Sequence, residues 1–237
     1  GLENCEVPIQ GFALPIGRFE GNPEGKQRIV IGAFAQDHWT DILPGLDALA
    51  GIRLDYYTDA GVAFSPRVAV VYSPVDGLDF KALYAMSYRA PTFKELYEEP
   101  RFDPLRANVG VEDLKPVTNN TLEFGATWRL RAAGVDYRLA GNFYISWLRD
   151  SIVGLYQGTG QPSFSNEQSI DLMGTELEAE ARFGQRSRLF VNNSWFRAKV
   201  RLLGLGDESY ITDSPQMRLN LGLDLGMGKW VNLHLGL

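Results

Sequence analysis

The sequence is poor in several features that would narrow its class at once. It has one cysteine, Cys5, and two histidines among 237 residues. One cysteine cannot form a disulfide within the chain. No run of about 18 or more apolar residues occurs, so no transmembrane helix is predicted, and a mean hydropathy of -0.16 excludes a helical membrane bundle. The net charge of -6 gives no reason to expect a nucleic-acid partner, because that function favours a basic surface.

Motifs of enzymes and cofactor sites are also missing. The sequence has no G-x-S-x-G elbow, no Walker loop and no dinucleotide-binding glycine pattern. His38 and His234 have no His, Cys, Asp or Glu at ligand spacing, so we expect interface or core histidines rather than a zinc site. We therefore expect no enzyme, no cofactor and no metal. A protease or lipase is the enzyme alternative.

What the sequence has instead is strict two-residue alternation. In "MRLNLGLDLG", Met217 to Gly226, every odd position is Met or Leu, and the even positions are Arg, Asn, Gly and Asp. A period of two belongs to a β-strand with two unlike faces. The same alternation appears in "TLEFGATWRL", "VDYRLAGNFYISWL" and "GTELEAEARF".

About ten long strands are predicted, most of them longer than the five or six residues usual in globular proteins. A tilted strand that crosses a bilayer needs about 9–11 residues. The expected ranges are 27–39, 47–57, 63–73, 78–89, 118–130, 135–149, 167–183, 187–200, 215–226 and 229–237.

The connections between these strands alternate in length. Tight turns are expected at 41–45, 74–77, 131–134, 184–187 and 226–229, whereas the other connections, at 58–62, 90–117, 150–166 and 201–214, include all the long ones. An antiparallel up-and-down transmembrane β-barrel has short turns at one end and long loops at the other. A soluble β-sandwich, the alternative, has no reason to sort its connections in this way.

Aromatic residues near the strand ends are typical of the belts at membrane interfaces. The aliphatic faces are then expected to meet lipid, and the polar faces a wet lumen. The expected lumen wall consists of Arg53, Arg67, Glu123, Arg129, Glu176, Glu178, Glu180, Arg182 and Arg218. Three glutamates at alternate positions could also bind Ca²⁺, but we interpret them as wall residues.

Substrate contacts are expected in the long loops, which tolerate variable chemistry. Arg and aromatic side chains suit an anionic, partly aromatic ligand, although they suit solvated loops equally well. The loop candidates are Tyr97, Arg101, Phe102, Arg106, Asn108 and Tyr156. At the start of 90–117, Thr92 and Glu95 have the spacing of a capping box. That segment could simply anchor the loop or could contact substrate directly.

Three stretches in order resemble the barrel of TonB-dependent outer-membrane receptors. They are "FSPRVAVVYSP" at 64–74, "LDFKALYAMSYRAPTFKELY" at 78–97 and "EDLKPVTNNTLEFG" at 112–125. "GAFAQDHW", "GIRLDYY" and "GTELEAEARF" also look like strands of that family. The resemblance covers about 27–226. Val117 departs from it, since a glutamate usually follows Lys-Pro in the family.

The resemblance implies a fold and an extent. Family barrels have 22 strands and a plug domain, so the chain, 1–237, is interpreted as a contiguous portion of such a barrel with no plug domain. Residues 1–26 are expected to be an external loop, and 90–117 a long external loop. A complete ten-stranded barrel is the other possibility.

The resemblance also implies a function. An outer-membrane receptor of a Gram-negative bacterium would bind a scarce nutrient chelate, a ferric siderophore first and cobalamin or haem next, and import it. The partners implied are TonB with its inner-membrane energising complex, acting through the plug, and outer-membrane lipid. The alternatives are a passive porin or structural outer-membrane barrel, and a soluble β-sandwich binding domain.

Overall fold

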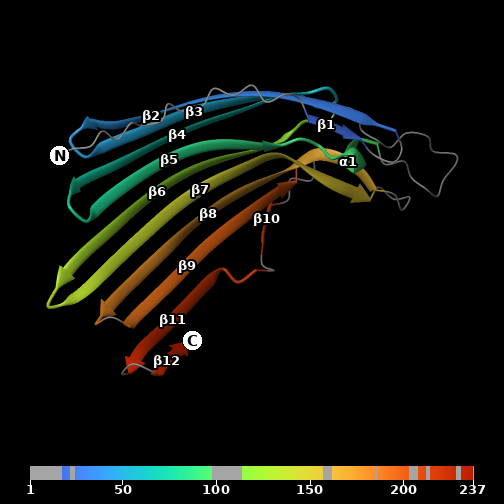
Figure 1. The fold of residues 1–237 in the computed structure, drawn as a ribbon. Coiled ribbons are helices and arrows are strands. Elements are labelled where there is room, and N and C mark those ends of the chain that lie inside the picture. Colours follow the sequence, from blue (N-terminus) through green and yellow to red (C-terminus); the bar gives the residue numbers. More distant parts are fainter. Residues whose placement is uncertain are drawn as a thin grey trace.

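The chain forms one arched antiparallel sheet (Figure 1). This computed structural model describes residues 18–21, 25–97, 114–156, 162–184, 186–202, 208–211, 214–227 and 231–236. Of the twelve strands in the described residues, eleven follow the order β1-β2-β3-β4-β5-β6-β7-β8-β9-β11-β12, and β10 pairs with β9 off this path. Along this path each strand pairs with the strands before and after it in the chain, except that β9 pairs with β11 because β10 branches off. This order confirms the up-and-down antiparallel fold class.

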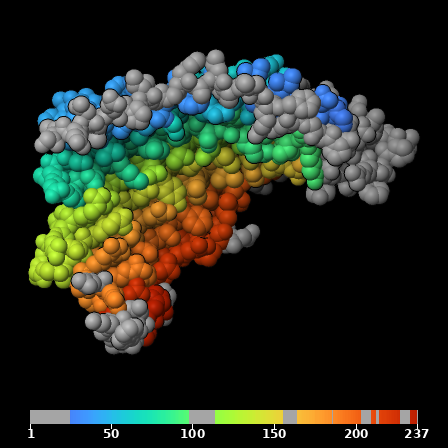
Figure 2. Space-filling view, in the orientation of Figure 1, coloured from blue at the N-terminus to red at the C-terminus, as the bar shows by residue number. Residues whose placement is uncertain are grey.

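The strands have the following bounds: β1 Arg18–Gly21, β2 Gln27–Leu43, β3 Leu46–Tyr57, β4 Gly61–Val75, β5 Leu78–Arg89, β6 Val117–Ala132, β7 Val135–Tyr156, β8 Pro162–Phe183, β9 Ser187–Leu202, β10 Glu208–Tyr210, β11 Met217–Met227 and β12 Val231–Gly236. One short helix, α1 Phe93–Tyr97, follows β5. In the space-filling view the strands lie side by side in chain order (Figure 2).

The structure differs from the sequence-based boundaries mainly in length. β7 and β8 have 22 residues each and stay paired as far as Tyr156↔Pro162, well into the expected 150–166 loop. The register of the β7–β8 pair shifts after Leu148, and Asp150 has a positive φ of 53°. The hairpin therefore continues past a bulge instead of ending there. β1 likewise lies within the expected 1–26 loop, and β10 within 201–214.

Tight turns join the strands at one end of the sheet. Gly45 and Gly77 close two of them with φ values of 74° and 81°, a conformation that L-residues rarely adopt. A Cβ on Gly45 would lie 2.3 Å from the carbonyl oxygen of Ser73, whose N–H donates to the Gly45 carbonyl at 2.7 Å. The turn therefore requires glycine for both its backbone shape and its close approach. The helix α1 lies at the opposite end (Figure 1).

The register assigns the side chains to two faces. Directly opposed residues share a face, so the rows Leu177↔Asn193↔Leu219 and Ala179↔Val191↔Leu221 belong to one face. We call this aliphatic side the outer face. The row Glu176↔Ser194↔Arg218 belongs to the other, which we call the inner face.

No second layer covers the outer face in the described part of the chain. Leu219 is 57% exposed, Leu177 56% and Ile31 54%. A β-sandwich would bury these side chains under a second sheet, so the described residues do not form one. Among the described residues there is also no helix long and apolar enough to cross a membrane.

Candidate functional site

The inner face gathers the polar side chains. All nine residues expected to line a lumen fall on this face. Their partners in the register are Ser65 for Arg53, Gly51 and Ala85 for Arg67, Tyr144 for Glu123, Arg138 and then Glu180 for Arg129, Ser194 and then Arg218 for Glu176, Asn192 for Glu178, and Arg188 for Arg182. That these residues line a lumen stays a prediction.

Ion pairs cross the middle of this face from strand to strand. Lys81 Nζ lies 2.5 Å from Glu123 Oε1, and Arg138 Nη1 lies 2.6 Å from Glu178 Oε2. The side chain of Lys81 passes over Gly125, where a Cβ would come within 2.3 Å of its Cε. Glutamates on this face thus form ion pairs with cations of neighbouring strands, as expected for a wall of mixed charge.

Towards the tight-turn end, the pattern of mixed charge continues. Arg129 pairs with Asp79 at 2.9 Å, and Glu180 pairs with Arg182. His234 is exposed, with its Nδ1 2.5 Å from Asp224 Oδ1, and Asp224 also accepts from Arg188. Because it is exposed, His234 is not a core residue, and its place at an interface stays a prediction. Its partner is on the adjacent strand, which spacing along one strand cannot reveal.

A denser network lies at the long-connection end of the inner face. Asp55 is 2% exposed and accepts two hydrogen bonds from Arg53, at 2.5 and 2.8 Å. Gly32, directly opposite Asp55, has no side chain, and a Cβ there would lie 2.2 Å from Asp55 Oδ1. Glycine on β2 therefore makes room for a buried carboxylate on β3.

Two tyrosines border this network. The hydroxyl groups of Tyr57 and Tyr88 are 3.2 Å apart, and their rings meet edge to face at 6.0 Å. The β4–β5 ladder ends at Arg67↔Ala85, whereas β5 continues to pair with β6 as far as Arg89↔Val117. Pro66 has no N–H to donate, so it cannot extend the β4–β5 ladder by a hydrogen bond from its own nitrogen. Tyr88 lies on the part of β5 beyond that ladder.

Arg28 ties the first long strand to the segment after β5. Its Nε donates to Asp59 at 2.6 Å and its Nη2 donates to the Pro91 carbonyl at 2.7 Å. The side chains of Arg28 and Asp59 are only 6% and 8% exposed. The guanidinium also lies 5.1 Å from the centroid of the Phe93 ring. This buried cation fixes the position of α1 against the sheet.

The expected capping box is present at α1. Thr92 Oγ1 accepts from the Glu95 N–H at 3.2 Å, and Glu95 accepts from the Thr92 N–H at 2.7 Å. Arg89 adds two hydrogen bonds to the same carboxylate. Burial raises the pKa of Glu95, but the bonds from Arg89 and Thr92 outweigh it and hold the pKa below its ordinary value of 4.5. Leu96 is 1% exposed, so the segment anchors the base of the connection.

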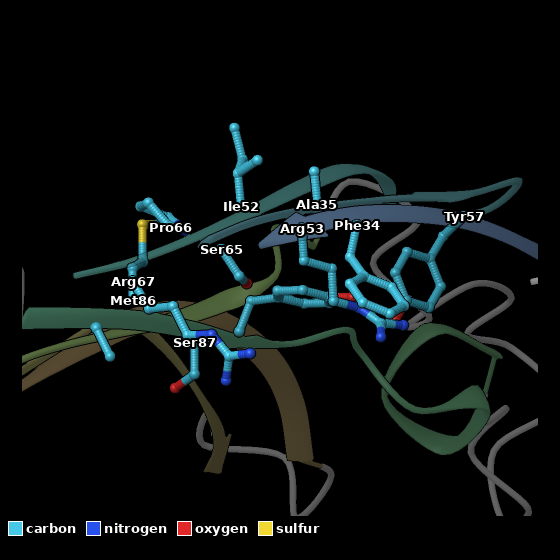
Figure 3. Close-up of a pocket in the computed structure, with 12 residues that line it drawn as sticks. Phe34, Ala35, Ile52, Arg53, Tyr57, Ser65, Pro66, Arg67, Met86 and Ser87 are labelled. Atoms are coloured by element: carbon cyan, nitrogen blue, oxygen red, sulfur yellow. The ribbon is translucent and has the colours of Figure 1, made fainter. Parts of the chain in front are cut away.

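A cavity of about 660 Å³ lies beside this network. Arg53, Ser65 and Ser87 point to the side of the sheet where α1 lies, whereas Ile52 points the opposite way (Figure 3). Phe34, Tyr57, Arg67 and Tyr88 also contribute to its polar and aromatic lining. Guanidinium, hydroxyl and aromatic groups together can hold an anionic ligand that also has flat apolar parts.

The loop candidates are mostly beyond what the structure describes. Arg101, Phe102, Arg106 and Asn108 lie outside the described residues. Tyr156 is the last residue of β7, so its assignment to a loop is wrong: the hairpin with β8 extends to it. Tyr97 is the last residue of α1, and the Lys26 ammonium lies 4.6 Å from the centroid of the Tyr97 ring.

Several residues of this end were not predicted to belong to a site, among them Arg28, Asp55, Asp59, Tyr57 and Tyr88. Alternation alone places Arg28, Asp55 and Tyr57 on the inner face, so a signal was present for these three. The turn residue Asp59 and the strand-end residue Tyr88 needed the tertiary structure. Among the described residues, no three His, Cys, Asp or Glu side chains gather in a way that could hold a metal ion.

Comparison with known proteins identifies the family. The model of the β-barrel of TonB-dependent receptor-like proteins matches residues 8–236. The chain is 30% identical over 128 residues to a hemin receptor of Yersinia pestis, covering 47% of this chain and 19% of that protein. It is 29% identical over 204 residues to a hemin receptor of Yersinia enterocolitica, covering 77% of this chain and 29% of that protein. The chain thus spans less than a third of these relatives.

A solved structure agrees on the fold. The siderophore receptor PirA from Acinetobacter baumannii superposes with a TM-score of 0.68 at 19% identity, over 88% of this chain and 32% of that one. The chain belongs to the TonB-dependent receptor family and forms part of its β-barrel. Members of this family are outer-membrane receptors and transporters of Gram-negative bacteria, not enzymes.

Proposed function

We propose that this chain is part of the wall of an outer-membrane receptor that binds a scarce nutrient chelate and imports it with energy from TonB. The observation that carries the proposal is the cavity at the long-connection end of the inner face, with Arg53, Arg67 and Tyr57 in its lining. In a barrel with long external loops, that end faces the outside of the cell. A ligand arriving there would meet cations and aromatic rings first.

We favour a ferric siderophore over haem because guanidinium and hydroxyl groups line the cavity and no histidine does. Haem iron takes an axial His, Cys, Met or Tyr from the protein, whereas siderophore iron already has its own ligands. Neither His38 nor His234, the two histidines, lies between residues 90 and 117. Both sit close to tight turns, at the far end of the strands from the cavity. The cavity lining does contain Tyr57, Tyr88 and Met86, which could serve as axial ligands, and an experiment can test this.

The first experiment measures binding to the complete receptor in detergent. A ferric siderophore should quench intrinsic tryptophan fluorescence saturably, and haem should bind without the Soret shift that axial ligation gives. Arg67→Gln should weaken siderophore binding roughly 10- to 150-fold, since a hydrogen bond to a charged group contributes about 1.5–3 kcal/mol. Arg182→Gln, on the same face near the tight turns, is the matched control and should bind normally. Equal affinity of the Arg67 and Arg182 variants, or a haem Soret shift lost in Tyr57→Phe, would contradict the assignment.

The second experiment separates a driven receptor from a passive porin. Cells that express the complete receptor should accumulate radiolabelled ferric siderophore only when TonB is present. Uptake that continues unchanged in a strain without TonB would favour the porin alternative.

A further inference from the structure

The outer face contains a group of cations at one place only among the described strands. On β7 and β9 the outward positions from Tyr137 to Trp147 and from Leu189 to Trp195 are all uncharged. The next outward position on each strand is an arginine, Arg149 on β7 and Arg197 on β9. Two further outward cations follow on β9, and we call the four residues the basic cluster: Arg149, Arg197, Lys199 and Arg201.

The height of this cluster follows from strand geometry. With a rise of about 3.4 Å per residue and a tilt of about 40°, the stretch from Tyr137 to Trp147 spans roughly 26 Å along the membrane normal. That equals the apolar band of an outer-membrane barrel, which is about 25 Å tall and bordered by aromatic girdles. Trp147 and Trp195 then lie at the upper girdle, and the basic cluster lies directly above it, at the level of lipid headgroups.

The cluster is held together by one acidic residue. Asp171 on β8 pairs with Arg149 at 2.6 Å and also with Arg201, on either side of it. The Arg149 guanidinium is further fixed by the carbonyl of Leu148 at 3.0 Å. Both arginines still expose about two fifths of their side chains, 38% and 42%. One carboxylate thus orients two guanidinium groups without neutralising the cluster.

A second contact orders the β9 side of the cluster. The guanidinium of Arg197 lies 4.1 Å from the centroid of the Tyr210 ring on β10. Tyr210 pairs in register with Lys199, so the aromatic ring stands among the cations on the same face. Two other acidic residues, Glu167 and Glu208, lie farther from the apolar band than Asp171 does, and Glu208 pairs in register with Arg201.

The neighbouring strands have no counterpart to the cluster. At the corresponding outward positions, β6 has Asn120 and Thr118, and β5 has Met86. On β4 the outward residues near the same end are Val62 and Phe64. The cations are therefore confined to the β7–β9 part of the outer face, where a lipid would meet them side by side.

We propose that the basic cluster binds the phosphate groups of an anionic glycolipid in the outer leaflet. This inference rests on the outer-membrane placement of the proposed function, but not on its substrate. Arginine forks match phosphate oxygens in bidentate geometry, and cations next to an anionic membrane surface each contribute about 1 kcal/mol. The ligand is a membrane lipid, because the cluster faces the same way as the apolar band directly below it.

The experiment uses the complete receptor in phosphatidylcholine vesicles that contain either bis-phosphorylated lipid A or its dephosphorylated form. Lipid retained by the receptor after gentle solubilisation is quantified by mass spectrometry. The wild-type receptor should retain the phosphorylated lipid and not the dephosphorylated one. An excess of inorganic phosphate should leave retention unchanged, since a headgroup without acyl chains lacks the contact with the apolar band.

Charge-removing variants locate the site. Removing one arginine, as in Arg197→Gln, should lower retention roughly fivefold, and the triple variant Arg149→Gln, Arg197→Gln, Arg201→Gln should abolish it. The matched control removes three inner-face cations, with Arg138→Gln, Arg182→Gln and Arg188→Gln, and should retain lipid A as the wild type does. Heat-modified mobility in electrophoresis checks that each barrel is folded.

Three results would overturn the proposal. They are retention that does not depend on the lipid phosphates in the wild type, full retention by the outer-face triple variant, and equal loss in the inner-face control. The wild-type comparison of the two lipids stands even if a triple variant does not fold. Failure of siderophore binding would leave these results unaffected, so the two proposals fail separately.

Discussion

The inner and outer faces of β6 to β9 share one backbone and differ in every second side chain. On the inner face Glu178 is matched by Arg138 across the β7–β8 ladder, and Glu180 lies beside Arg182. On the outer face the same strands present Leu177 and Ala179. The inner face thus satisfies its charges strand by strand, whereas the outer face leaves aliphatic groups for another phase to cover. Alternation alone therefore divides this sheet into an aliphatic surface and a charged surface.

Within the inner face, the largest effect is expected where charge is buried. Arg28→Gln should lower the free energy of unfolding by about 3–5 kcal/mol, because it leaves the buried Asp59 carboxylate without its cation. Urea unfolding of the receptor, refolded into lipid vesicles, measures this. Arg28→Gln combined with Asp59→Asn should recover part of the loss. A double variant as unstable as the single one would show that the pair is not what matters.

The outer face should reject charge that the inner face accepts. Leu221→Arg on β11 should cost about 2–4 kcal/mol, the penalty for arginine near a bilayer midplane. Asn220→Arg, one residue away on the inner face, should change stability by less than about 0.5 kcal/mol. The same unfolding measurement compares them. Equal costs would mean that the two faces do not meet different surroundings.

The capped segment at α1 should respond to pH. The pKa of Glu95 is lowered in the folded state, so the stabilisation is complete above the unfolded value of 4.5 and is lost as pH falls through the lower folded value. Glu95→Gln should cost about 1 kcal/mol at neutral pH, because the amide oxygen can still accept from the Thr92 N–H but the ion pair with Arg89 is lost, and it should remove this response. Amide hydrogen exchange of residues 92–97 at neutral and acidic pH reports it. Lys94→Gln, its neighbour, is the control and should keep the response.

The smallest effect is expected for an exposed inner-face pair. Lys81→Gln separates the ammonium from Glu123, but the two side chains are 50% and 25% exposed, so the cost should be 0–1 kcal/mol. Unfolding at low and high salt measures it, and the difference between wild type and variant should shrink as salt rises. A loss as large as that of Arg28→Gln would place Lys81 in a desolvated site inside the complete receptor.

Much of this architecture could be predicted before any coordinates. All ten expected strands are present, and the alternation assigned residues such as Glu176 and Arg218 to the same face, as the register has it. The capping box of Thr92 and Glu95 was also legible, because its spacing is local. What could not be read is pairing between distant strands. The contact of Arg28 with Asp59, and the continuation of β7 to Tyr156, depend on which backbone lies alongside.

By itself, the sequence determined the strands, their tight turns and the chemistry of each face, since a period of two and a glycine with positive φ are properties of the local chain. The tertiary structure decided which charges meet. Only the register brings Asp171 between Arg149 and Arg201, and only the close approach of β2 and β3 leaves room at Gly32 for a buried Asp55. Charges separated by tens of residues interact only when backbone hydrogen bonds have fixed their strands side by side.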